Sequence, residues 1–296
     1  MIFKKLTKSL NNKPVVVFVQ KALDEGVILL DKERTHVPSG FFNVSDLGYC
    51  MRQVYYRHTA KNDFPVNLLK KFGAGIDAGQ RVVKFLQRAG ILYGSYVCRS
   101  CAAHNTNCEI PTTCGCDQGH GGIVYSELSI RNTKRKISGK VDLFVKKDKV
   151  WLAEVKSAST YYKLMDKKSV AAKLGHNIQQ TNMYMGMIRS HLRTIDKGRK
   201  TPFLFTDTET GALINGTTLG RGMNTESFLM IYEDKNSSEH YVHEFGYDHG
   251  MYLKDLEHVE SFYKYLEAKK RPPRRLEDLK NCKYCDYVAL CNQKGK

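Results

Sequence analysis

The sequence predicts one α/β or α+β domain. Segments with the alternating pattern of strands lie between segments with helical periodicity, which is the order expected when helices cover a sheet. No internal repeat and no low-complexity linker divides the 296 residues, and a chain of this length can bury a sizeable core. We therefore treat residues 1–296 as a single domain that carries a small cysteine-rich insertion at residues 94–122.

Three helices are expected before that insertion. Residues 15–30 place apolar side chains on one side of a short helix. A second helix is expected to begin at Ser45, because a serine hydroxyl can cap the free amides of a first turn. A third is expected from about Gly75 to Ala89, ending at Gly90.

Strands follow the insertion. Residues 123–130, 137–145 and 150–157 have strand patterns, and the turn at residues 146–149 joins the last two into a hairpin. The remaining elements are expected in this order: a long helix through Ile188, a Gly/Thr-rich loop at residues 206–224, a hairpin of residues 227–234 and 239–245, and a helix from about Leu253 to Lys269.

The chain is strongly basic, with a formal net charge of +17. Excess positive charge favours a polyanionic partner, although a solubilising surface gives the same number. No apolar run approaches the ~20 residues that a membrane-spanning helix needs, and the N-terminus lacks a secretory core. We therefore expect a cytoplasmic protein with no membrane partner, whose nine cysteines are thiolate ligands rather than disulfides.

Two acids and a lysine indicate a divalent-metal site. Glu154 and Lys156 are two residues apart on one expected strand, so they share a face while Val155 points to the other. Asp142 lies on the strand paired with theirs, so its carboxylate can converge on the same spot. Two carboxylates and the Val155 carbonyl oxygen suit one or two Mg²⁺ or Mn²⁺ ions. Such ions polarise a phosphodiester and activate a bound water, which Lys156 would orient.

The ordinary alternative is a solvated ion pair, which is what E-x-K on an exposed strand usually forms. The strand from Trp151 to Val155 is too apolar for an exposed edge, and charged groups beside a buried sheet need a partner. Glu127, on the preceding strand, is either a further acid of the site or a surface residue. Gln180 and Tyr184 are four apart on an expected helix and share a face.

Gln180 would position a metal-bound water or a nucleotide, and Tyr184 would bond a phosphate. The alternative is that both form a polar edge beside a core stripe of methionines. Three motifs now stand in one order along the chain: G-x-V-D at residues 139–142, E-x-K at residues 154–156 and Q-x-x-x-Y at residues 180–184.

In this order the chain resembles the RecB-like branch of the PD-(D/E)XK nucleases, which includes CRISPR-associated exonucleases and many bacteriophage homologues. The resemblance covers nearly the whole chain, from Ser45-x-Leu47-x-x-Cys50 to Cys291. It implies a restriction-endonuclease-like core, with a central mixed β-sheet flanked by helices. It also implies roles for the motif residues: Asp142 and Glu154 as metal ligands, Lys156 as the catalytic lysine, and Gln180 with Tyr184 as a fourth motif.

One departure concerns the metal-binding histidine that the family usually carries four residues after a helix glycine. Counting from Gly75 puts Gly79 at that position, with Gln80 adjacent. Either Gln80 or a water takes its place, or the metal site is weakened. The departure leaves room for a catalytically inactive member that only binds DNA.

The cysteines at the two ends form one expected cluster. Cys282, Cys285 and Cys291 close the chain as C-x2-C-x5-C, and Cys50 is left over once the middle group is set aside. Spacing alone allows an iron–sulfur cluster or a tetrahedral Zn²⁺ site. The resemblance favours a 4Fe–4S cluster, because RecB-like exonucleases use this one-plus-three pattern to clasp the N-terminal helical part to the C-terminus. A redox-sensing regulator is a further alternative.

The insertion offers a second ligand set, Cys98, Cys101, Cys114 and Cys116. A polar, Gly-rich loop of this length cannot build a hydrophobic core, so bound Zn²⁺ is the expected stabiliser. C-x-C is tighter than the usual knuckle, so Cys108, His104 or His120 can replace one ligand. This zinc-ribbon-like insertion is either a flap that contacts DNA or a partner, or a structural knob.

Basic runs recur along the chain, and those beside the expected site suit a channel that follows phosphates. They are Lys134–Lys136, Lys146-Lys147, Lys167-Lys168, Arg199-Lys200, Lys269–Arg271 and Arg274-Arg275. Tyr55, Tyr56, Tyr161 and Tyr162 either stack on unpaired bases or pack in the core. The expected function is a metal-dependent exonuclease on single-stranded DNA or duplex ends, in recombination, repair or replication. The sequence has no G-x4-G-K-[ST] loop, so we expect no ATP-driven motor in this chain, and a separate helicase or recombinase is a candidate partner.

Overall fold

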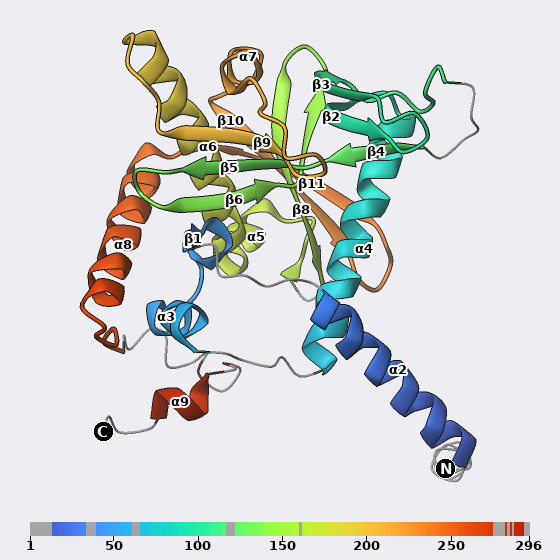
Figure 1. The fold of residues 1–296 in the computed structure, drawn as a ribbon, viewed down its shortest axis with the longest axis vertical. Coiled ribbons are helices and arrows are strands. Elements are labelled where there is room, and N and C mark those ends of the chain that lie inside the picture. The colour runs from blue at the N-terminus through green and yellow to red at the C-terminus, as the bar shows by residue number, and fades with distance from the viewer. Residues whose placement is uncertain are drawn as a thin grey trace.

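The fold is built on two β-sheets (Figure 1). The computed structural model describes residues 14–33, 40–60, 66–116, 122–159 and 162–274, together with Cys282, Cys285 and residues 287–292. The smaller sheet has the order β1-β6-β5-β9, with β1 at Phe42–Asn43, β5 at Leu128–Asn132, β6 at Ile137–Val141 and β9 at Phe203–Asp207.

The larger sheet has the order β11-β10-β8-β7-β2-β3, and β4 also pairs with β2. Its strands are β2 (Leu92–Cys98), β3 (His104–Glu109), β4 (Ile123–Ser126), β7 (Leu143–Lys146), β8 (Val150–Ala158), β10 (Ser227–Asp234) and β11 (His240–Gly246). β10 runs parallel to β8, whereas β7 and β8 form an antiparallel hairpin. The predicted central mixed β-sheet flanked by helices is therefore confirmed.

The chain crosses between the two sheets at two acidic residues. β4 of the larger sheet leads through Glu127 into β5 of the smaller one, and β6 leads back through Asp142 into β7. The prediction of continuous strands at residues 123–130 and 137–145 was therefore wrong, because each segment is two strands in different sheets. Both acids are placed where the strand pairing changes.

Helices cover the sheets. They are α2 (Pro14–Glu33), α3 (Met51–Thr59), α4 (Val66–Arg88), α5 (Lys167–Lys173), α6 (Gly175–Asp196), α7 (Gly216–Arg221), α8 (His249–Glu267) and α9 (Val288–Asn292), with a 3-10 turn at Val44–Asp46. Within the described ranges, no helix combines the length and the apolar character that crossing a membrane requires.

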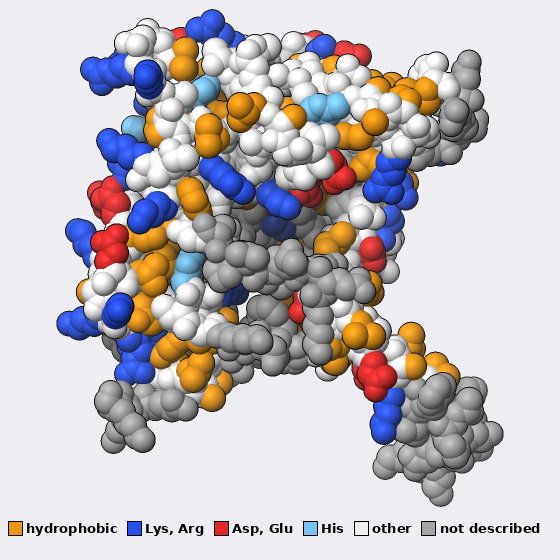
Figure 2. Space-filling model, in the orientation of Figure 1, with side chains coloured by type: hydrophobic (Ala, Val, Ile, Leu, Met, Phe, Trp, Pro, Cys, Tyr) orange, Lys and Arg blue, Asp and Glu red, His pale blue; other side chains and the backbone are white. Residues whose placement is uncertain are grey.

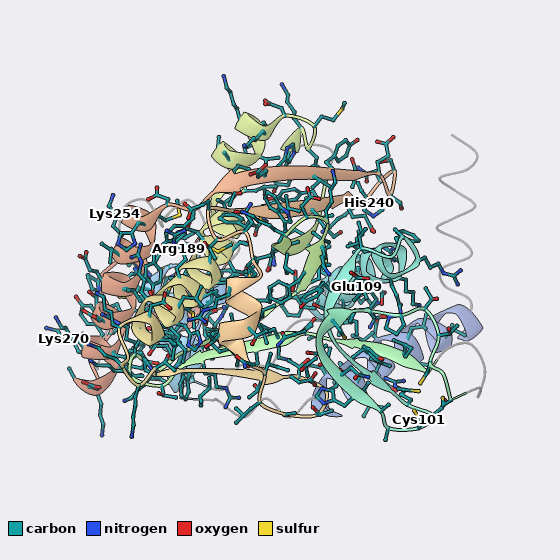
Figure 3. All side chains as sticks on the ribbon, turned by 90° about the horizontal axis from the view of Figure 1, so that it is seen from above. Cys101, Glu109, Arg189, His240, Lys254 and Lys270 are labelled. Carbon is teal, nitrogen blue, oxygen red and sulfur yellow. The ribbon has the colours of Figure 1, made fainter. Side chains whose placement is uncertain are left out.

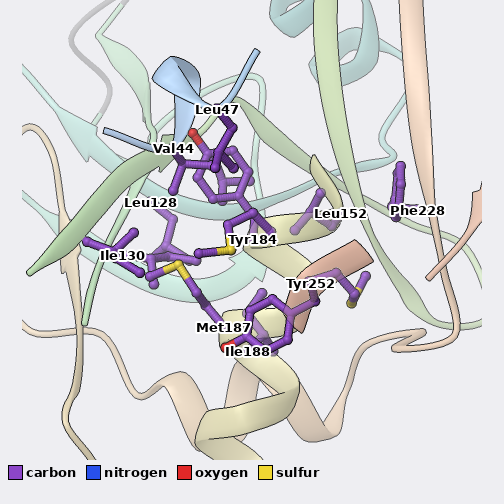
Figure 4. Packing of buried hydrophobic residues seen from close by; sticks show 14 of the residues in the cluster. Val44, Leu47, Leu128, Ile130, Leu152, Tyr184, Met187, Ile188, Phe228 and Tyr252 are labelled. Carbon is purple, nitrogen blue, oxygen red and sulfur yellow. The ribbon is translucent and has the colours of Figure 1, made fainter. Parts of the chain in front are cut away.

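The two faces of β8 pack against different helices. Leu152 belongs to the large core cluster that contains the buried side of α6. Ala153 and Val155 belong to a second cluster with Val82 of α4. This alternation is the one expected for a strand between two layers. Figure 4 shows the large cluster, with Tyr184 of α6 pointing toward Val44 and Leu47.

Several predicted boundaries were wrong. Ser45 lies in the 3-10 turn, and the residue at the N-cap of α3 is Cys50, which forms no side-chain capping bond. α4 begins at Val66 rather than Gly75, since its buried face continues back to Leu69 across the glycines. Its end before Gly90 is confirmed, and Gly90 has a φ of +71°, which favours glycine.

The cysteine-rich segment is also more ordered than predicted. Residues 94–98 belong to β2, a strand of the larger sheet, so the insertion is narrower than residues 94–122. The segment predicted as one long helix is two, with α5 ending before Leu174 and α6 starting after it. The predicted loop at residues 206–224 contains the end of β9 and all of α7.

Candidate functional site

The two candidate carboxylates lie on adjacent strands. Glu154 is in β8, and Asp142 immediately precedes β7, the hairpin partner of β8. The backbone N–H of Val155 donates a hydrogen bond of 2.8 Å to Asp142 Oδ2, which fixes this carboxylate against β8. The structure therefore brings Asp142 beside Glu154. The Val155 carbonyl as a further metal ligand stays a prediction.

Two side chains converge on one oxygen of Glu154. Lys156 Nζ donates to Glu154 Oε1 at 2.6 Å, and Gln180 Nε2 donates to the same atom at 2.8 Å. The prediction that Glu154 and Lys156 share a face is confirmed. Gln180 reaches the pair from α6, the helix that packs on this side of β8.

The other oxygen of Glu154 is buried and unpaired within the described part of the chain. The side chain is 0% exposed, and no described residue forms a hydrogen bond with Oε2. Burial and the Asp142 carboxylate raise the pKa of Glu154 to about 8, although Lys156 opposes the shift. A buried, unsatisfied carboxylate oxygen costs free energy unless something binds it. A divalent cation shared with Asp142 would satisfy this oxygen and favour the ionised form, so these residues fit a metal ion.

Lys156 keeps its charge. Burial lowers the pKa of Lys156, but the carboxylates of Glu154 and Asp142 outweigh it and the net shift is upward. Its side chain is 29% exposed, so the ammonium group lies between the buried acid and the surface. A permanent cation at that position suits an incoming phosphate.

Tyr184 lies one helical turn beyond Gln180 and is 1% exposed. Gln180 Nε2 donates to its hydroxyl at 3.3 Å, and burial raises the pKa of Tyr184 well above its usual range. A Cβ at residue 139 would lie 2.8 Å from the hydroxyl oxygen and closer to the ring, so only Gly139 leaves room for this tyrosine. The buried hydroxyl supports Gln180, and the predicted bond from Tyr184 to a phosphate stays a prediction.

Glu127 is half-buried beside the site. Burial and then the Asp142 carboxylate raise the pKa of Glu127, so the two acids face each other where the chain changes sheets. Glu209 also raises this pKa, whereas Lys140 and Lys156 lower it. Glu209 was not predicted from the sequence as a site residue. It lies in a turn after β9 that only the fold brings alongside Glu127.

Tyr232 is a second residue that the sequence did not single out. It pairs with Lys156 across the parallel strands β10 and β8 and is fully buried. Gln80, the predicted substitute for the missing histidine, is exposed on α4. α4 packs on the Val155 side of β8, away from the face that carries Glu154, so the structure does not bring Gln80 to the carboxylates.

The four predicted zinc ligands do come together. The sulfur atoms of Cys98, Cys101, Cys114 and Cys116 all lie within 4.8 Å of one another. Among the described residues, no other group of three or more Cys, His, Asp or Glu side chains has its ligand atoms this close together. The carboxylates of Glu127, Asp142 and Glu154, taken as a group, are therefore farther apart than these sulfur atoms. Figure 3 shows Cys101 at the end of the molecule opposite Lys254 of α8 and Lys270, which follows this helix.

Two of the three alternative ligands, Cys108 and His104, have other contacts. Cys108 Sγ is directed to the Gly94 carbonyl at 3.7 Å, and the His104 ring contacts Asp207 Oδ2 at 3.1 Å. His120 lies outside the described residues. Backbone N–H groups, chiefly that of Cys101, lower the pKa of Cys98 to about 6, which favours a thiolate. This group could hold a metal ion.

α3 contacts the segment of residues 287–292, whereas the predicted iron–sulfur clasp between Cys50 and Cys282, Cys285 and Cys291 stays a prediction. Tyr56 of α3 stacks on Tyr287 with ring centroids 5.8 Å apart, and its hydroxyl donates to the Leu290 carbonyl at 3.3 Å. Arg52 and Arg274 donate to Cys291 Sγ at 3.3–3.5 Å. Burial raises the pKa of Cys291, but these two arginines lower it below its usual value.

Of the two alternatives for the tyrosines, these contacts favour packing. Tyr56 is stacked on Tyr287, and Tyr55 and Tyr162 pack against the core, so stacking on unpaired bases stays a prediction. Tyr161 lies outside the described residues.

Figure 2 shows lysine and arginine side chains along the side formed by α8 and again at the centre of the face, next to acidic side chains and a hollow.

The sequence matches no family model and no curated protein. Among solved structures, the chain is similar to the crystal structure of SSO0001, with 15% identity over 94% of this chain and 98% of that one and a TM-score of 0.45. It is also similar to LHK-Exo in complex with dAMP, with 10% identity over 78% and 89% of the two chains and a TM-score of 0.33. Likenesses of this size carry no functional assignment, so the function is argued from the site.

Proposed function

We propose that this protein is a metal-dependent DNA exonuclease of the PD-(D/E)XK type, which hydrolyses phosphodiester bonds in single strands or at duplex ends. The observation that carries the proposal is Glu154 Oε2, a fully buried carboxylate oxygen next to Asp142 to which none of the described residues donates a hydrogen bond. A net charge of +17 supports a polyanionic substrate.

Each site residue has a distinct part in this proposal. Asp142 and Glu154 would hold Mg²⁺ or Mn²⁺, which activates a water and polarises the phosphodiester when bound. Gln180 orients Glu154 through its 2.8 Å hydrogen bond, and the Tyr184 hydroxyl accepts a hydrogen bond from Gln180 and so positions it. Lys156 balances the charge of the phosphate that approaches from the surface side. Glu127 either acts on Asp142 through its negative charge or serves as a further ligand of the Mg²⁺ or Mn²⁺ ion.

Two structural metal groups complete the proposal. Cys98, Cys101, Cys114 and Cys116 would hold Zn²⁺ at the end of the β2–β3 hairpin. Cys50, Cys282, Cys285 and Cys291 would hold a 4Fe–4S cluster that ties α3 to the C-terminal segment, where Arg52 and Tyr56 already make contacts. A separate helicase or recombinase would deliver the DNA ends.

The test is cleavage of end-labelled single-stranded and duplex DNA by protein purified without oxygen, with Mg²⁺ or Mn²⁺. Wild type should degrade DNA, and Asp142→Ala and Lys156→Ala should each lose the activity while keeping the same unfolding midpoint. Asp148→Ala, in the exposed β7–β8 turn, is the matched control and should cleave like wild type. Cleavage that persists in Asp142→Ala would show that another site or a contaminant acts.

A second candidate is a DNA-binding module that has lost catalysis. The observation that favours it is the placement of Gln80, which is exposed and does not reach the carboxylates. DNA binding by a wild-type protein that cleaves no substrate with either ion would support this candidate over the nuclease.

A further inference from the structure

His176 occupies the first turn of α6, one turn before Gln180 and two turns before Tyr184. Residues four apart on a helix lie on one face, so these three side chains form a row. Exposure decreases along it: His176 is exposed, Gln180 is half-buried and Tyr184 is 1% exposed. The row leads from the surface to Glu154, which Gln180 contacts at 2.8 Å. His176 therefore marks the outer end of the site.

The position of His176 is fixed by close packing. A Cβ at residue 48 would lie 2.4 Å from the Cβ of His176, so only a glycine lets the chain pass this close. Gly48 belongs to the segment between the 3-10 turn and α3, two residues before Cys50. The imidazole is thus held beside the segment that leads into the proposed clasp, rather than moving freely on the surface.

The imidazole nitrogens have no structural task that the described residues reveal, since neither takes part in a hydrogen bond with them. Burial and then the positive charge of Lys156 lower the pKa of His176. The placement of His176 near the site rests on α6, since the ring lies one turn before Gln180, and Gln180 and Lys156 donate to the same oxygen of Glu154. A neutral imidazole still offers one N–H donor.

We propose that His176 donates a hydrogen bond to a non-bridging oxygen of the substrate phosphate at the mouth of the site, beside Lys156. This inference rests on the proposed nuclease function and adds a substrate-binding residue to it. Lys156 supplies charge, and His176 supplies a directed donor that fixes how the phosphate enters. Gly48 is a positioning residue, because its lack of a side chain sets where the ring lies.

The experiment compares His176→Ala and His176→Gln with wild type in cleavage of end-labelled single-stranded DNA. A hydrogen bond to a charged group is worth about ten- to a hundred-fold, so His176→Ala should lower kcat/KM by that factor. His176→Gln keeps a neutral N–H donor and should stay within about threefold of wild type. His249→Ala, at the exposed start of α8, is the matched histidine control and should not change the rate.

Two further measurements separate the possible outcomes. Unfolding midpoints should be equal for all variants, whereas a lower midpoint in both His176 variants with equal loss of activity would show a packing role and overturn the inference. Equal rates for His176→Ala and wild type, with Asp142→Ala inactive, would overturn the inference and leave the nuclease standing. If wild type cleaves no DNA, the proposed nuclease function is rejected. The contact between His176 and the phosphate is then tested by fluorescence anisotropy of labelled DNA without divalent ions. Weaker DNA binding by His176→Ala, but not by His176→Gln or His249→Ala, supports the contact, and unchanged binding rejects it.

Discussion

The carboxylate site on β8 and the four-cysteine group at the end of the β2–β3 hairpin are both suited to cations, but they are built in opposite ways. The cysteines come from residues 98–116, and their sulfur atoms lie within 4.8 Å of one another. The carboxylate site draws Glu127 and Asp142 from two junctions between strands, Glu154 from β8 and Gln180 from α6. One group is local along the chain, and the other depends on the whole fold.

The difference has energetic consequences. Cys101 is exposed, so a metal ion bound there would supply interactions that the hairpin otherwise lacks. Metal binding would therefore add to folding stability. Glu154 is 0% exposed, so the fold bears the cost of burying an acid in order to present it. Metal removal should therefore loosen the cysteine group, whereas loss of the acid should leave the fold intact.

The largest expected effect is on catalysis. Glu154→Gln keeps the shape of the side chain but removes the charge that a metal ion needs, so the cleavage rate should fall by about 10³-fold or more. The unfolding midpoint should not fall, because a neutral amide is easier to bury than a carboxylate. Initial rates on end-labelled DNA and thermal unfolding of the same samples check both statements.

A loss of rate that is accompanied by a lower midpoint would contradict this division of roles, since Glu154 would then be part of what holds the core together. Asp148→Asn serves as the matched control, because it removes an exposed carboxylate six residues away in the β7–β8 turn. It should change neither the rate nor the midpoint.

The next effect is on metal content and stability. Cys101→Ser should reduce bound zinc from about one equivalent to near zero in the presence of a competing chelator. Loss of the site should lower the unfolding midpoint by roughly 3–5 °C, corresponding to about 2–3 kcal/mol in a protein of this size. Zinc analysis by mass spectrometry and thermal unfolding provide the two readouts.

Cys108→Ser is the control for this variant, because Cys108 is in the same hairpin but its sulfur is directed to the Gly94 carbonyl. It should keep the zinc. Cys285→Ser should do the opposite of Cys101→Ser, retaining zinc while losing iron and the visible absorbance of the proposed cluster. Loss of zinc in Cys108→Ser would mean that the ligand set differs from the four cysteines.

The sequence predicted the local features of both regions. C-x2-C and C-x-C within a short hairpin restrict where the four thiols can lie, so spacing was sufficient. The same-face relation of Glu154 and Lys156 follows from the period of a strand, and that of Gln180 and Tyr184 from the period of a helix.

The remaining features depend on tertiary structure. Nothing in the alternation of residues 123–130 or 137–145 reveals that the chain changes sheets at Glu127 and Asp142. Glu209 acts on Glu127 only because β9 pairs with β5. The sequence left two roles open for Tyr184, because a tyrosine four residues after Gln180 fits either a phosphate contact or a buried support, and burial is decided by the packing of α6.

The smallest expected effect is on pH dependence, and it tests the burial of Glu154 directly. Burial and Asp142 raise the pKa of this carboxyl from 4.5 to about 8. A metal ligand must be deprotonated, so metal binding below that pH displaces a proton. The apparent affinity for Mn²⁺ should rise by up to about tenfold per pH unit between about pH 6 and 8 and level off above.

The free energy of unfolding of the metal-free protein depends on pH in the opposite direction to the Mn²⁺ affinity. Because the folded pKa lies above the unfolded one, the contribution of Glu154 is fully present below about pH 4.5 and is lost as the pH rises through about 8. The metal-free protein should therefore lose unfolding free energy over this range, and Glu154→Gln should lose less. Lys156→Met removes the cation that opposes the shift, so its Mn²⁺ affinity should level off at a higher pH than that of wild type. Calorimetric Mn²⁺ titrations and denaturant unfolding across a pH series measure both effects, and an affinity independent of pH would mean that Glu154 is ionised before the metal ion arrives.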